Sequence, residues 1–209
     1  MRGMALVAIF ISVAAGLQNP PPQPPPAAPA TTPAPGGRGG GRGRGAVQIM
    51  TLTSAAWPDG GQIPVKHSQP GGDISPALSW TNAPDTAASF VLIVHDLDAA
   101  TGSGVDDFLH WLVWNIPGSA RALPEHVPQG ATLADGTRQI SATGPNYRGP
   151  AAPASGPPHH YVFELFALDA PIDVPAVGAS PAQTRAAVLA AMAGHVCGKG
   201  VYAGTFKRP

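Results

Sequence analysis

Short apolar segments recur along residues 46–209, and Pro, Gly, Asn and Asp separate them. Most of these segments are rich in β-branched and aromatic residues, which is typical of strands. We predict strands at 47–52, 89–95, 109–116, 137–142, 161–168 and in the closing 194–208 stretch. Many short strands with few helical stretches predict a mainly all-β fold, an antiparallel β-sandwich.

One helix is predicted near the C-terminus. Ser180 is a good N-cap, Pro181 suits the first helical position and Gln183 can complete a capping box. Gly194 is a natural stop. The residues at helical spacing form an apolar stripe that we expect to pack on the core: Ala182, Ala186, Leu189 and Ala193.

The first 45 residues differ in composition from the rest. Residues 1–18 have a basic start, a short apolar run and small residues, so we expect a signal peptide and a periplasmic or secreted protein. Residues 19–45 are rich in Pro and then in Gly and Arg, which predicts a disordered linker. The domain is therefore expected to occupy residues 46–209.

Charge divides at the same boundary. Residues 1–45 hold four arginines and no acid, whereas the remainder holds eight Lys or Arg against all twelve acids. The Arg-Gly run resembles RNA-binding segments, but for an exported protein we favour a solvated tether with weak attraction to anionic surfaces such as membranes. With Cys197 as the lone cysteine, no intrachain disulfide can form.

Polar residues flank the two central predicted strands. Asp96 and Asp98 follow the apolar run 91–94, and His110 precedes the next run. If the backbone is extended there, the two aspartates point to the same side, near His110. Aspartates are also common loop formers, so this pattern alone leaves a purely structural role open.

Two later stretches could complete a pocket. The Gly-Pro segment 144–150 could aim backbone N–H groups near Gly149 at an anion. His159 and Tyr161 open a strongly β-forming run and should share one side of that strand. Imidazoles and a phenol can donate to a phosphate or carboxylate, and aspartates can orient histidines or accept from an ammonium group.

Several segments together carry a family resemblance. LSWTNAPDTAASFVLIVHDLDA, LHWLVWNIP, GPNYRGP, HHYVFELFALD and GHVCGKGVYAGTFKR occur in this order. They resemble the phosphatidylethanolamine-binding protein family, in its bacterial Raf kinase inhibitor-like branch. The resemblance implies a β-sandwich with a short C-terminal helix and a small anion-binding cavity. The ligand-binding residues that it implies are Asp96, Asp98, His110, Gly149, His159 and Tyr161.

The chain departs from the family pattern at the implied cavity. The family's DPDAP loop reads DLDAA here, so Leu97 and Ala100 replace two prolines, and Ala151 stands where a Cys often occurs. Prolines restrict the backbone, so we expect a more mobile rim and an altered ligand preference.

These features favour a non-catalytic exported protein that binds a phosphate-containing ligand or a phospholipid headgroup, without cofactor or metal. A role as a kinase or protease inhibitor-like regulator of a protein target, and a homodimer, are further options that the resemblance leaves open. One alternative is a metal-dependent or His/Asp hydrolase that uses the same pocket. Another is an interaction protein that docks through its basic tether. No basic and aromatic pattern for a specific nucleic acid is visible in 46–209.

Overall fold

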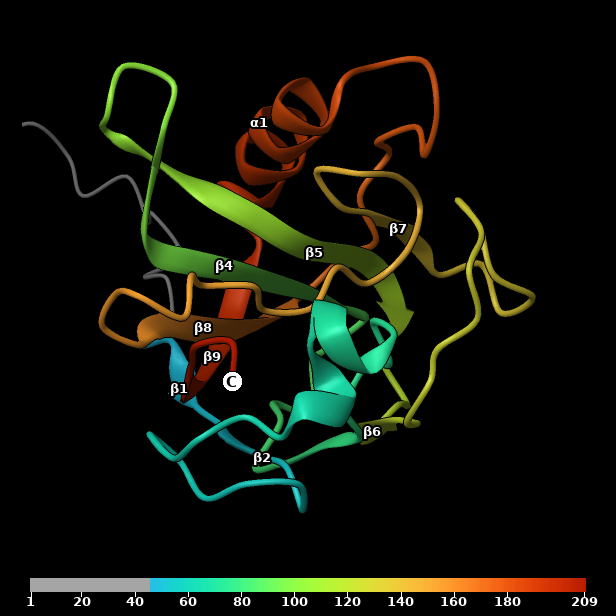
Figure 1. Cartoon of the computed structure of the whole chain (residues 1–209). Coiled ribbons are helices and arrows are strands. Elements are labelled where there is room, and N and C mark those ends of the chain that lie inside the picture. Colours follow the sequence, from blue (N-terminus) through green and yellow to red (C-terminus); the bar gives the residue numbers. More distant parts are fainter. Residues whose placement is uncertain (1–45) are drawn as a thin grey trace, which may run out of the picture. The chain divides into compact units, whose positions relative to one another are not determined.

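Two β-sheets and one α-helix are the main elements of the computed structural model, which describes residues 46–209 (Figure 1). The larger sheet has six strands in the order β1-β9-β8-β4-β5-β7. In that order they are Gln48–Ile49, Val196–Phe206, His159–Leu168, Ser89–Thr101, Asp106–Pro117 and Arg138–Ile140. The smaller sheet contains β2 (Thr51–Thr53), β3 (Leu78–Thr81) and β6 (Ala122–Leu123).

All strand pairs are antiparallel except β1 with β9. Between β2 and β3 lie two short 3₁₀ helices, η1 (Val65–His67) and η2 (Gln69–Gly71). The predicted antiparallel β-sandwich is confirmed, and within residues 46–209 the one α-helix, α1 (Pro181–Met192), lies late in the sequence as expected.

Two apolar clusters hold these layers together. One fills the space between the sheets, with Trp80, Phe90 and Phe163 among its fully buried side chains. The other joins the outer face of the larger sheet to α1, through Trp114 and Val188 among others. The central strands β4, β5 and β8 are thus covered on both faces, which explains their long apolar runs.

The helix begins as predicted but buries a different side. The Ser180 hydroxyl accepts from the Gln183 backbone N–H, and the Gln183 side chain accepts from the Ser180 N–H, so the capping box is present. The prediction that the Ala182–Ala186–Leu189–Ala193 stripe packs on the core is wrong. The buried side chains of α1 are Thr184, Val188 and Met192. Burying Val188 and Met192 removes more apolar surface from water than burying the alanines would, and is therefore more stabilising.

The two central strands are longer than predicted. β4 runs on to Thr101, which pairs with Asp106 at the start of β5. Asp96 and Asp98 therefore lie within β4 rather than beyond its end, and His110 lies inside β5. Shifts in the β4–β5 pairing accompany this extension.

The predicted first strand, 47–52, is divided between the two sheets. Its first part forms β1, and its last part begins β2 after the buried Met50. The expected signal peptide and linker, residues 1–45, lie outside the described part of the chain. Within residues 46–209, no helix is long and apolar enough to cross a membrane.

Candidate functional site

Asp96 and His159 form the centre of the candidate site. Asp96 pairs with Tyr161 in the β4–β8 register, so the start of β8 lies beside it. The Asp96 carboxylate is 5% exposed, and its Oδ2 accepts from His159 Nδ1 at 2.8 Å. Because the Nδ1 proton is engaged, the Nε2 edge of the partly exposed His159 ring is left for a ligand.

His110 is oriented by the backbone of the Gly-Pro segment. Its Nδ1 donates to the Arg148 carbonyl oxygen at 2.6 Å, and the residue is 3% exposed. Burial is the main cause that lowers the pKa of His110 below its ordinary value. Near neutral pH the ring is therefore uncharged, and Nε2 carries its lone pair.

Tyr161 closes the site from the β8 side. Its hydroxyl oxygen accepts from the backbone N–H groups of Ala151 and Ala152, at 3.3 and 3.2 Å. Burial, followed by the charge of Asp96, raises the pKa of the Tyr161 hydroxyl, so it stays protonated and can donate. The ring lies edge-on to His110 at 5.1 Å and stacks on His159 at 6.5 Å between centroids.

Asp98 bonds to His160 and not to a member of this group. Its Oδ2 accepts from the backbone N–H of His160 at 2.6 Å and from His160 Nδ1 at 2.8 Å. These hydrogen bonds, the backbone one first, lower the pKa of Asp98. The expectation that Asp96 and Asp98 share one side does not hold, because Asp96 Oδ1 accepts from the N–H groups of Asp98 and Ala99 and bends the backbone there.

Gly149 contributes close packing rather than a free donor. Its N–H donates to Asp73 Oδ1 at 2.8 Å. A Cβ at this position would lie 2.6 Å from the His67 carbonyl oxygen, so the segment passes too near η1 for a side chain. The backbone donors that do face a site residue belong to Ala151 and Ala152.

Four of the six predicted residues are thus brought together: Asp96, His110, His159 and Tyr161. They present two oriented imidazoles and a protonated phenol beside one buried carboxylate, a set that can bind an oxyanion once a ring Nε2 takes up a proton and becomes a donor. Within residues 46–209, no three His, Cys, Asp or Glu side chains are grouped so that they could hold a metal ion.

The sequence of the domain matches a known protein family. The phosphatidylethanolamine-binding protein family model matches residues 53–207. The chain belongs to the phosphatidylethanolamine-binding protein family. The family match covers every residue of the candidate site.

Relatives and solved structures agree with this assignment. A UPF0098 protein of Methanothermobacter thermautotrophicus is 37% identical over 161 residues, which cover 76% of this chain and 99% of the relative. LppC of Mycobacterium tuberculosis, provisionally named a lipoprotein, is 33% identical over 162 residues, 76% of this chain and 75% of LppC. The crystal structure of YbcL from Escherichia coli, described as a new member of the mammalian family, aligns with a TM-score of 0.62 at 28% identity, covering 77% of this chain and 99% of YbcL.

Two residues that support the site were not predicted from the sequence. Asp73 bonds Gly149 and also pairs with Arg148, whose Nη1 lies 3.1 Å from its Oδ2. Arg148 further donates from Nη2 to Gln69 Oε1 at 2.8 Å. Arg148 could have been predicted, because it lies inside the family segment GPNYRGP. Nothing near Asp73 in the sequence indicates that it contacts this segment.

Proposed function

We propose that this protein is a non-catalytic binding protein whose site, formed by Asp96, His110, His159 and Tyr161, takes a phosphate group. The observation that carries the proposal is the orientation of the two imidazoles. Each ring is fixed through Nδ1, one by a carboxylate and one by a carbonyl, so that Nε2 of each remains for a ligand. The Tyr161 hydroxyl adds a third hydrogen-bonding group.

Proton uptake by His110 would favour an anion as the ligand. The lowered pKa leaves the buried ring neutral when the site is empty. A phosphate oxygen placed against Nε2 would favour the charged ring and raise this pKa again. Phosphate binding should therefore take up a proton, whereas a neutral ligand would give no such uptake.

The phosphate could belong to a small phosphorylated molecule or to a phospholipid headgroup, and the two share this chemistry. A headgroup that carries an ammonium would find a carboxylate at Asp98, whose side chain is 43% exposed and pairs through Oδ2 with His160. We infer an envelope or extracellular location for the protein. The lipoprotein name of LppC supports it, and fractionation of cells that express the full chain would test it.

The test is a calorimetric titration of the purified protein with inorganic phosphate, O-phosphoethanolamine and ethanolamine, in two buffers that differ in ionisation enthalpy. We expect saturable binding of both phosphate compounds with net proton uptake. Ethanolamine should not bind measurably by itself. Tighter binding of O-phosphoethanolamine than of phosphate would favour a headgroup, and equal affinities would favour a small phosphorylated ligand.

Three variants make the test specific. His110→Ala and His159→Ala should each weaken phosphate binding at least tenfold, and the first should abolish the proton uptake. His195→Ala is the matched control, because His195 pairs with Asp169 beyond the far end of β8. Unchanged affinity in the two site variants would overturn the proposal, and release of phosphate from a phosphomonoester that depends on His159 would replace it with a hydrolase.

A further inference from the structure

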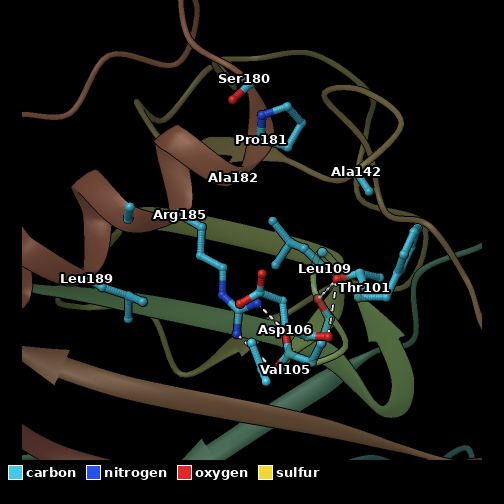
Figure 2. Close-up of a pocket in the computed structure, with 14 residues that line it drawn as sticks. Thr101, Val105, Asp106, Leu109, Ala142, Ser180, Pro181, Ala182, Arg185 and Leu189 are labelled. Atoms are coloured by element: carbon cyan, nitrogen blue, oxygen red, sulfur yellow. Dashed lines mark hydrogen bonds and ion pairs between the residues drawn. The ribbon is translucent and has the colours of Figure 1, made fainter.

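A cleft lies between α1 and the β4–β5 hairpin, and it contains none of the candidate site residues. Its volume is about 700 Å³, within the range of small-molecule pockets. We call it the helix cleft. Its walls include Val105, Leu109, Ala182, Arg185, Ala186 and Leu189, and Figure 2 shows Arg185 extending from the helix toward the hairpin.

The apolar stripe that the core does not use faces this cleft. Ala182, Ala186 and Leu189 line it, whereas Val188 and Met192 of the same helix are buried against the sheet. Leu189 is 45% exposed, and Val105 on the hairpin is 87% exposed. A helix with apolar residues on both sides, one covered and one lining a hollow, indicates that the open side accepts an apolar group.

The charges beneath the cleft are paired with one another. Both Nη atoms of Arg185 contact the two carboxylate oxygens of Asp107, and Asp107 Oδ2 also accepts from His95 Nδ1 at 2.5 Å. His95 Nε2 lies 3.3 Å from Glu164 Oε2, and Lys199 pairs with the other oxygen of Glu164 at 2.6 Å. Among the residues that line the cleft, Arg185 is the one cationic side chain, and Asp107 neutralises it.

One charge in the cleft has no such partner. Asp106 is exposed and lines the cleft, and it makes no ion pair with any residue of 46–209. Its carboxylate is near the hairpin backbone, since a Cβ placed on Gly102 would lie 2.5 Å from Asp106 Oδ2. A ligand in this cleft thus meets apolar walls, a neutralised floor and one free carboxylate.

We propose that the helix cleft binds a small apolar molecule that carries a protonated amine. The apolar part lies against Val105, Ala186 and Leu189, and the ammonium group faces Asp106. A carboxylate in the same position would be repelled by Asp106 and would find Arg185 already engaged. The site is separate from the phosphate site and does not depend on it.

The experiment compares three probes of equal chain length, n-octylamine, 1-octanol and octanoate, by calorimetry at pH 7. Octylamine should bind saturably, 1-octanol more weakly and octanoate weakest of all. Asp106→Asn should weaken octylamine about two- to fivefold, the range of an exposed ion pair, and leave 1-octanol unchanged. Octanoate that binds as tightly as octylamine would overturn the proposal.

A pair of tryptophan variants tests the location. Ala186→Trp fills the cleft from an exposed helix position and should reduce octylamine binding at least tenfold. Ala190→Trp is the matched control, because Ala190 is exposed on the same helix but does not line the cleft. Thermal melts of both variants check that the fold is kept. Octylamine affinity that is equal in the two variants would refute the site, and phosphate affinity should be unchanged in both, which keeps this result distinct from the phosphate proposal.

Discussion

Gly149→Ala should destabilise the protein through backbone overlap rather than through loss of a ligand contact. The added Cβ would lie 2.6 Å from the His67 carbonyl oxygen and 2.7 Å from Ser68 Cα. Ordinary contacts begin at 3.4 Å, so the two segments must separate by roughly 0.7–0.8 Å. Overpacking of this kind costs about 1–3 kcal/mol. Weakening the Gly149–Asp73 hydrogen bond adds about 1 kcal/mol.

Alanine also restricts the unfolded chain, which offsets about 0.4–1 kcal/mol of this loss. The net expected destabilisation is about 1–3.5 kcal/mol, or roughly 3–10 °C in Tm for a domain of this size. Thermal and urea unfolding would measure it. Gly156→Ala is the control, because its Cβ would have only the Pro153 carbonyl oxygen nearby, at 3.9 Å. If the Gly149 variant melts within one or two degrees of this control, the overlap argument is refuted.

The remaining predictions concern the hydroxyl of Tyr161 and the charged group beneath α1. Tyr161→Phe removes the acceptor of two backbone N–H groups and should cost about 1–2 kcal/mol in urea unfolding; an unchanged midpoint would contradict this. The hydrogen bond with His95, together with Lys199, lowers the pKa of Glu164 to about 2. The ionised Glu164 therefore stabilises the fold above pH 4.5, and this stabilisation is lost as the pH falls toward 2. Glu164→Gln should lower stability at pH 6 by about 2 kcal/mol and flatten this acid dependence, and equally steep acid unfolding of the variant would disprove it. Burial disfavours the charged ring of His95, but hydrogen bonds to Glu164 and Asp107 outweigh burial and raise the pKa of His95. The charged ring therefore stabilises the fold fully below pH 6.5, and this stabilisation declines as the pH rises through the raised pKa. The urea midpoint of His95→Gln should therefore differ most from that of the wild type near pH 6 and differ less as the pH rises, and a difference that stays constant with rising pH would exclude the effect.

The parts of the site that follow strand alternation could be predicted from the sequence. β8 is hydrogen-bonded to β4 on one side and to β9 on the other. Pairing on both sides keeps the two-residue period, so His159 and Tyr161 face one side and His160 the other. The same reasoning failed at Asp98, where the Asp96 carboxylate captures two backbone N–H groups and bends the chain.

The helix shows a second limit of sequence patterns. Two apolar stripes run along α1, and small alanines dominate the stripe that was predicted to pack on the core. Tertiary packing decides between them, because Val188 and Met192 join the buried cluster that also contains Trp114 and Ile140 of the sheet. The Asp73–Gly149 hydrogen bond is a third case, because its partners are 76 residues apart and neither carries a local signal of the other.

His95 and Asp96 are neighbours in β4, yet one contacts Glu164 and Asp107 and the other contacts His159. One strand thus serves two unrelated groups on its opposite faces. Inserting or deleting a single residue between Ser89 and Asp96 would exchange these faces, placing the imidazole in the candidate site and the carboxylate beneath α1. We therefore expect natural relatives to tolerate changes in chain length at the hairpin tip, residues 102–105, and to conserve the length of β4 before it.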